Sequence, residues 1–240
     1  MYEPRHYRLW AKEKDLVSFN VVVKETDLFI QAKSDLTKKA LEVVARQRAL
    51  LEGYIARYPK FGTTLEPFAI GEDAPPIVRE MAEAAQRVGV GPMAAVAGAV
   101  AEYVGKELLA YSPEVIVENG GDIFLKNLTS RTVAIYTGKP PYSGKIALRI
   151  EPEETPLGVC TSSGTVGHSL SFGRADAAIV ISPSTVLADA AATAVGNLVN
   201  EESDLYRGIE FARGIEGLRG AVIIKGDRMA LWGEVKIVKI

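Results

Sequence analysis

Apolar positions in this chain follow two different periods, and each period predicts a different kind of element. Recurrence every three or four residues is typical of an amphipathic helix, whereas short β-branched runs between Gly, Pro, Asn or Asp are typical of strands. The expected helices cover residues 36–58, 77–88, 92–110, 188–199 and 203–213. The expected strands cover residues 18–23, 28–32, 114–117, 123–128, 133–137, 145–150, 157–160, 177–181, 221–225 and 228–233.

The order of these elements predicts the fold class. Runs of strands followed by runs of helices occur twice, which favours an α+β fold with helices packed on one face of antiparallel sheets. The four strands between residues 114 and 150 are separated only by turn residues, so we expect them to form a meander. We expect one domain over residues 1–240, in which 1–112 and 113–240 are halves of similar architecture.

Composition and charge narrow the class of protein. The chain is 48% apolar and 24% charged, and its formal net charge is -2 without any Lys/Arg block, so nucleic acid is not an expected partner. Residues 1–16 lack a signal-peptide pattern, and the Ala-rich stretch 93–104 is too short to span a membrane, so we expect a cytoplasmic protein. One cysteine, Cys160, excludes an internal disulfide, and two histidines exclude a Cys/His zinc cluster.

Three segments carry the candidate chemistry, and the first consists of Asn119, Gly120, Gly121 and Asp122. Asn-Gly and Gly-Gly supply the positive φ that a tight hairpin requires, so a plain turn is one interpretation. The alternative is that the glycines let the backbone approach a ligand while Asp122 accepts a hydrogen bond. Under this alternative we expect Gly121 to have ordinary dihedrals and to lie against the ligand.

The second segment consists of Thr161, Ser162, Ser163 and Gly164, with His168 close behind. Hydroxyl-rich loops are commonly solvated turns, and a lone histidine is commonly structural. Here both follow the same expected strand. A cluster of hydroxyls, free amides near Gly164 and one imidazole can hold a phosphate and move a proton.

The third segment places Asp189 and Thr193 four residues apart in an Ala-rich helix, so both lie on one face. A carboxylate and a hydroxyl are hard oxygen ligands that suit Mg²⁺, which takes few protein ligands and fills its shell with water and phosphate oxygens. The structural alternative is that the aspartate favours the helix dipole and the threonine bonds back to a carbonyl.

Together and in this order, the three segments resemble the motifs of the ApbE superfamily of flavin-transferring enzymes. Residues 120–123 resemble the family's G-G-D-I, residues 161–164 resemble S-T-S-G, and residues 188–194, the most specific match, resemble A-D-A-L-A-T-A. Residues 93–102 are similar to the family's G-G-I-A-K-G-Y-A-V-D, with Glu102 in the place of the acid. The resemblance covers roughly residue 89 onward.

This resemblance implies a T-fold-like α+β architecture, with FAD in a cleft between two halves and Mg²⁺ near its pyrophosphate. Asp189 and Thr193 match the family's metal ligands, and His168 is the candidate for its transfer histidine. Glu102 and the first two segments would contact the cofactor. Family members transfer FMN from FAD to a threonine or serine of a target protein, or hydrolyse FAD to FMN and AMP. The implied partners are a flavin nucleotide and a protein acceptor, with a homo-oligomer left open.

The chain departs from the family at two places. After His168 it reads Ser-Leu-Ser-Phe-Gly-Arg, so the family's D-P-R-T-G is missing, and Ala97 replaces the lysine of the helix motif. The pattern is closest to the short UPF0280 branch, for which links to sulfur assimilation have been proposed. Three functions stay open: Mg²⁺-dependent cleavage or transfer, a flavin- or partner-binding module without turnover, and thiol or persulfide chemistry at Cys160 and His168.

Overall fold

The computed structural model describes residues 15–138, 140–165 and 171–240, which contain five α-helices and eleven strands. The helices are α1 (Thr37–Arg57), α2 (Pro76–Val88), α3 (Val96–Leu108), α4 (Thr185–Asn197) and α5 (Leu205–Arg213), with short 3-10 turns η2 (Pro59–Gly62), η3 (Pro92–Ala95), η4 (Pro152–Glu154) and η5 (Glu202–Asp204). The strands are β1 (Val17–Val23), β2 (Thr26–Ala32), β3 (Val115–Asn119), β4 (Asp122–Lys126), β5 (Arg131–Ala134), β6 (Ile146–Ile150), β7 (Leu157–Ser162), β8 (Ala177–Ser182), β9 (Gly220–Lys225), β10 (Arg228–Gly233) and β11 (Ile237–Lys239).

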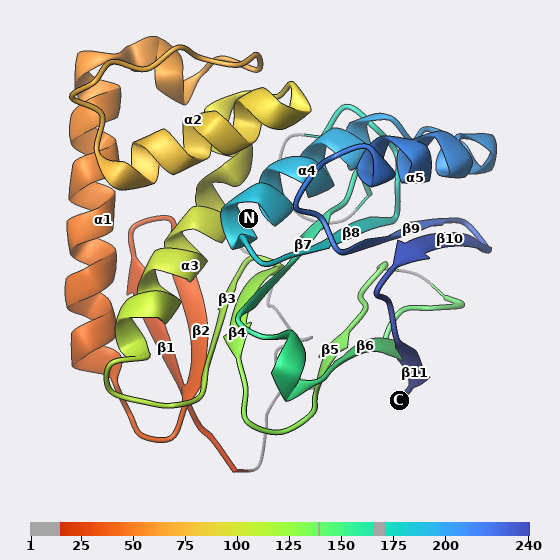
Figure 1. Ribbon diagram of the computed structural model, residues 1–240, viewed down its shortest axis with the longest axis horizontal. Coiled ribbons are helices and arrows are strands. Elements are labelled where there is room, and N and C mark those ends of the chain that lie inside the picture. Colours follow the sequence, from red (N-terminus) through yellow and green to blue (C-terminus); the bar gives the residue numbers. More distant parts are fainter. Residues whose placement is uncertain (1–14, 139, 166–170) are drawn as a thin grey trace.

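An eight-stranded antiparallel sheet forms the centre of the molecule, with the strand order β1-β2-β3-β4-β7-β8-β9-β10. The helices cover one of its faces, and a smaller sheet with the order β11-β6-β5 lies on the other side (Figure 1). Neighbouring residues of β4 face these two layers, because Phe124 belongs to the core under the helices and Leu125 to the core between the sheets. The molecule therefore has three layers and two apolar cores.

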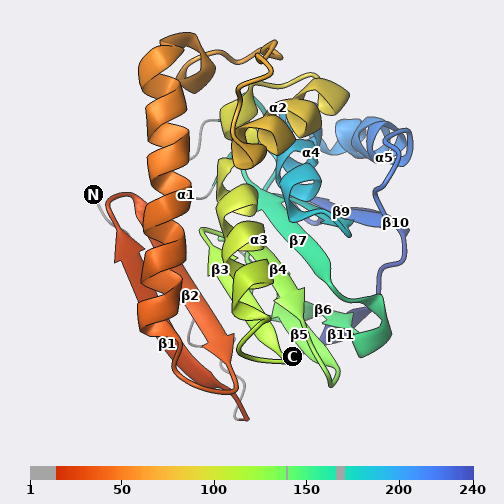
Figure 2. The same ribbon diagram turned by 60° about the vertical axis from the view of Figure 1, so that its left-hand side comes forward.

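The strands of both expected halves join in the large sheet, since β2 pairs directly with β3 (Figure 2). The α+β class, the antiparallel sheets and the helices on one face are confirmed. The polar turns at residues 24–27 and 226–227 predict two hairpins, and both form, as β1–β2 and β9–β10. The first helix begins at Thr37, whose N–H donates to Oδ1 of Asp35 at 2.8 Å.

The expected meander between residues 114 and 150 is wrong. Only β3 and β4 remain neighbours in the large sheet, and β5 and β6 leave it to form the small sheet with β11. The chain departs at Asn127, whose side-chain amide donates to the carbonyls of Thr129 and Ile150. Strand β7 then occupies the free edge of β4. Apolar periodicity predicted the strands but not this change of partner.

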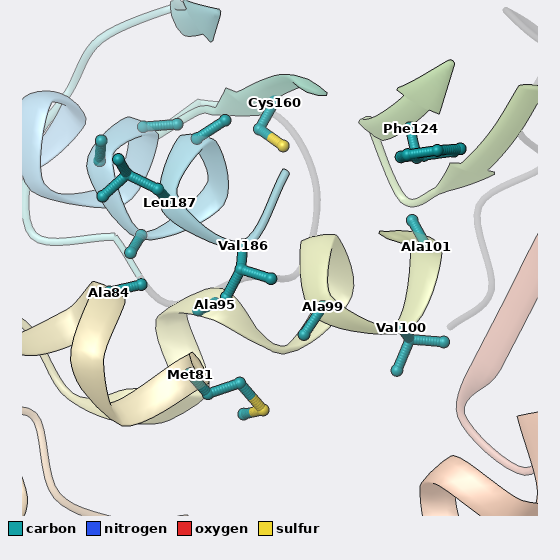
Figure 3. Packing of buried hydrophobic residues seen from close by; sticks show 14 of the residues in the cluster. Met81, Ala84, Ala95, Ala99, Val100, Ala101, Phe124, Cys160, Val186 and Leu187 are labelled. Carbon is teal, nitrogen blue, oxygen red and sulfur yellow. The ribbon is translucent and has the colours of Figure 1, made fainter. Parts of the chain in front are cut away.

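Small side chains bring α2, α3 and α4 close together over the sheet. Figure 3 shows Ala84, Ala95 and Ala99 in the contacts between these helices. At the other end of α3, Gly105 lies on the ring of Phe124, and a Cβ on this glycine would be 2.1 Å from a ring carbon.

In the described part of the chain no single helix is long and apolar enough to cross a membrane. Helix α2 and the η3–α3 segment meet that criterion only as a pair bent by 106°.

Candidate functional site

Helices α3 and α4 cross at Gly98, close to the first turn of each helix. A Cβ on Gly98 would lie 2.5 Å from the carbonyl oxygen of Thr185 and 2.7 Å from the Cβ of Asp189, so only glycine permits this approach. The Gly98 N–H donates to Oδ2 of Asp189 at 2.7 Å. Asp189 is thereby held in the interior of the molecule, with 8% of its surface exposed.

The turn between β3 and β4 lies beside the same crossing. The side-chain amide of Asn119 donates to the Ala97 carbonyl, at the start of α3, at 3.0 Å. Oδ1 of Asp122 accepts the Thr161 N–H at 3.2 Å, which connects the turn to the end of β7. Asn119 and Asp122 are both buried. The residues that flank the two glycines therefore belong to the interior around Asp189, whereas Gly120 is exposed and Gly121 is half-buried.

Both glycines of this turn have positive φ, 70° at Gly120 and 108° at Gly121. The expectation that Gly121 has ordinary dihedrals is therefore wrong, because a two-residue hairpin turn of this kind requires positive φ at both central positions. The Gly121 N–H donates to Oε1 of Glu118 at 3.0 Å. The nearest atom to a Cβ placed on Gly121 is the Thr161 carbonyl oxygen at 3.8 Å, so space is left on that side of the turn.

Two buried carboxyl groups, Asp122 and Asp189, belong to this interior, and the charge of Asp122 disfavours the ionisation of Asp189 while the charge of Glu118 disfavours that of Asp122. Burial raises the pKa of Asp122 from 3.8 to about 7, although the hydrogen bond from the Thr161 N–H acts in the opposite direction. Burial also raises the pKa of Asp189 well above its ordinary value, and the charge of Asp122 raises it further. Without a compensating cation the site therefore resists carrying both negative charges.

This donor set fits a hard divalent cation. A cation beside Asp122 and Asp189 would offset the cost of ionising both, and carboxylate oxygens are ligands that Mg²⁺ prefers. Among the described residues, no three side chains of His, Cys, Asp or Glu are grouped closely enough to hold a metal by themselves. Two carboxylates match a Mg²⁺ site completed by water and phosphate oxygens, as opposed to a closed protein cage.

The hydroxyl-rich segment follows β7 at the edge of this site. Ser162 lies against α4, since a Cβ on Gly196 would be 3.3 Å from its Oγ. The backbones of Gly164 and Gly173 are in contact, since a Cβ added to Gly164 would be 2.0 Å from the carbonyl oxygen of Gly173. The expected catalytic residue His168 lies outside the described residues. The structure thus places both flanks of the histidine segment beside the C-terminal part of α4.

Ser163 and Thr193 occupy the outer side of this region. Oγ of Ser163 accepts the Thr165 N–H at 3.2 Å, so this hydroxyl shapes the loop. Thr193 lies one turn after Asp189 on α4 and is half-buried. An open hollow of about 580 Å³ adjoins the loop, and residues including Gly164, Arg174 and Lys225 line it.

Glu102, expected to contact the cofactor, contacts the start of α4 in the structure. Its Oε2 accepts the Val186 N–H at 3.0 Å, and its Oε1 pairs with Lys106 at 2.6 Å. The side chain of Glu102 is 4% exposed. Both oxygens are therefore engaged within the protein.

Cys160 is a buried neighbour of the two carboxyl groups, and its side chain points toward the helix layer in Figure 3. Its Sγ donates to the Thr185 carbonyl at 3.5 Å. Burial raises the pKa of this thiol, and the charges of Asp122 and Asp189 raise it further.

Sequence reasoning missed Gly158, where an added Cβ would lie 2.5 Å from the Cα of Thr185. A glycine inside an apolar strand was the available signal for this close approach.

Comparisons with known proteins agree with this geometry. The family model described as "AbpE bacteria" matches residues 8–210. The UPF0280 protein of Methanocella arvoryzae is 45% identical over 219 residues, which cover 90% of this chain and 89% of the relative. The fold is similar to the flavinyl transferase ApbE of Pseudomonas stutzeri (15% identity, 91% and 94% coverage, TM-score 0.57). It is also similar to the flavin transferase ApbE of Vibrio cholerae (15% identity, 91% and 96% coverage, TM-score 0.60). The chain therefore belongs to the ApbE-like family, in the branch of the UPF0280 proteins.

Proposed function

We propose that this protein binds FAD or a related pyrophosphate nucleotide together with Mg²⁺ and cleaves the pyrophosphate, with FMN passing to a protein acceptor or to water. The observation that carries the proposal is the pair of buried carboxyl groups, Asp122 and Asp189, at the meeting point of the glycine turn and the hydroxyl-rich segment. The flavin transfer named in the titles of the similar structures supports the choice of nucleotide.

The residues of this chain take distinct roles in the proposed reaction. Asp189 and Thr193, with Asp122 beside them, would hold Mg²⁺, which neutralises charge developing on the phosphates. The backbone at Gly120 and Gly121 would contact the nucleotide, together with the hydroxyls of residues 161–163 and the amide of residue 164. An acceptor hydroxyl forms the new P–O bond to FMN, the P–O bond to AMP breaks, and His168 takes the acceptor proton.

The test is AMP release from FAD in the presence of Mg²⁺, with and without cell extract as a source of acceptor. We expect Asp189→Asn to abolish release, because it removes a charge from the proposed metal site while keeping an acceptor for the Gly98 N–H. Glu83→Gln, an exposed change on α2, is the matched control and should leave release unchanged. His168→Ala should abolish release and retain FAD binding. If no extract yields AMP with the unmodified protein, the transferase proposal is wrong.

The missing D-P-R-T-G segment favours a second candidate, a flavin- or partner-binding module without turnover. Such a module would be purified with intact FAD, which absorbance and mass measurement of the released ligand would identify. The third function, thiol chemistry at Cys160, has less support. This thiol is fully buried and its pKa is raised, whereas reactive cysteines are accessible and have lowered pKa values.

A further inference from the structure

Glu102 belongs to α3, yet its carboxylate is placed at the first turn of α4. The first N–H groups of any helix lack partners within the helix and need acceptors from elsewhere. In α4 the Leu187 N–H is accepted by Oγ of Ser184 at 3.2 Å, and the Val186 N–H is accepted by Glu102 at 3.0 Å. Glu102 therefore completes the cap of a helix to which it does not belong.

Asp189 makes the reciprocal contact from α4 to α3. The residue that precedes α3, Ala95, provides no side-chain cap. Oδ2 of Asp189 supplies an acceptor for the Gly98 N–H in the first turn of α3. Each helix thus contributes one buried carboxyl group to the first turn of the other, where it accepts a backbone N–H.

These two contacts determine where the Asp189 carboxylate lies. Val186 and Asp189 are three residues apart on α4, so they lie on the same side of the helix. The backbone contact between Gly98 and Thr185 leaves no room for the helices to approach further. The bond from Glu102 to the Val186 N–H prevents the first turn of α4 from moving away. Without this bond, the hydrogen bonds from the backbone amides of Gly98 and Ala97 would still hold Asp189 across the crossing, but the first turn of α4 would lose its tie to α3.

Both carboxylate oxygens of Glu102 have partners within the protein, because one accepts the Val186 N–H and the other pairs with Lys106. Lys106 is 56% exposed and balances the charge of Glu102 from the surface. We propose that Glu102 is a positioning residue that holds the start of α4, and with it Asp189, in the geometry that the metal site requires. The consequence for metal binding rests on the proposed function, whereas the structural coupling between Glu102 and Asp189 does not.

Four variants of the full chain test this role. Glu102→Ala removes the acceptor, and Glu102→Gln keeps an amide oxygen that can accept the Val186 N–H. Lys106→Ala removes only the ion pair. Val104→Ala removes buried methyl groups from the same helix and is the control for a general loss of stability. The first readout is the affinity for Mn²⁺, used as a probe for Mg²⁺ and measured by titration calorimetry.

We expect Glu102→Ala to weaken Mn²⁺ binding by about tenfold or more, since partners that orient metal ligands typically contribute this much. The Mn²⁺ affinities of Glu102→Gln, Lys106→Ala and Val104→Ala should stay within about threefold of that of the unmodified protein. A threefold change corresponds to about 0.7 kcal/mol of binding free energy. Equal weakening by Glu102→Ala and Val104→Ala would overturn the proposal, because a loss of stability alone would explain it. Failure of Glu102→Gln to rescue binding would also overturn it.

Hydrogen exchange at the Gly98 amide is the second readout and does not depend on any ligand. In Glu102→Ala the Gly98 and Val186 amides should both exchange about tenfold faster than in Val104→Ala at equal global stability, because the crossing opens locally. Unchanged exchange at Gly98 would overturn the proposal even if Mn²⁺ affinity fell. If the unmodified protein binds no Mn²⁺, the metal part of the proposed function is wrong, and the exchange measurement still decides the role of Glu102.

Discussion

Asp122→Asn is the change that most directly tests the buried carboxyl pair. Asparagine has nearly the same shape, and its carbonyl oxygen can accept the Thr161 N–H that Asp122 accepts now. The substitution removes the negative charge and leaves the hydrogen bond in place. It is therefore a better probe than alanine, which would leave that buried amide without an acceptor at a cost of about 1–3 kcal/mol.

The magnitude follows from the raised pKa of Asp122. The difference between 3.8 in the unfolded chain and about 7 in the folded protein corresponds to about 4 kcal/mol, at 1.36 kcal/mol for each pH unit. Because the folded state holds this proton more tightly, the contribution of Asp122 to stability is greatest in acid and is lost as the pH rises from about 4 to about 7. Asparagine has no such dependence.

The size of the stability difference between Asp122→Asn and the unmodified protein depends on the pH of the measurement. Between pH 5 and pH 8 the carboxyl group of the ligand-free protein loses about 3 kcal/mol of stability relative to asparagine. We therefore expect the gain in stability of Asp122→Asn over the unmodified protein to be larger by this amount at pH 8 than at pH 5. For a chain of this length, 1 kcal/mol shifts the melting temperature by about 2–4 °C, so the gain should differ by about 6–12 °C between the two pH values.

The assay is thermal melting of both proteins at pH 5 and pH 8, in chelator and then in excess Mg²⁺. In Mg²⁺ at pH 8 the unmodified protein should be stabilised more than the variant, because the cation offsets the two charges. Glu83→Gln, an exposed substitution on α2, is the control for a change of charge away from the site. If Asp122→Asn shifts the melting temperature equally at both pH values in chelator, the raised pKa is wrong and the argument for a cation site loses its basis.

Three further changes test other parts of the site. Gly98→Ala should lower the melting temperature and weaken Mn²⁺ binding together, because its Cβ would be 2.5 Å from the Thr185 carbonyl oxygen; normal binding would show that the crossing can widen. Gly121→Ala should cost about 1 kcal/mol or more in denaturant unfolding because of its φ of 108°, and an unchanged midpoint would contradict this. In a thiol-reagent assay Cys160 should react only in denaturant, since it is fully buried, and rapid reaction of the native protein would revive the thiol function.

Local pattern alone determined most of the secondary structure and the residue types of the site. Hydrophobic periodicity predicted the five helices and ten of the eleven strands, and the two hairpins followed from their short polar turns. The three-residue strand β11 was missed, because a segment so short carries no measurable period. Glycines, hydroxyls and two separate aspartates in a recognisable order indicated where the chemistry lies along the chain.

Tertiary structure decided which of these residues meet. Periodicity reports that a residue is buried but not what it is buried against, so it could not show that β5 and β6 leave the large sheet. It also could not show that the charge of Asp122 acts on Asp189, because their proximity depends on the order of β3, β4 and β7 and on the crossing of α3 over α4. For the same reason Glu102 was assigned to the cofactor, whereas the fold directs its carboxylate to the first turn of α4. Burial and long-range approach, and not local residue type, set the charge state and role of these acids.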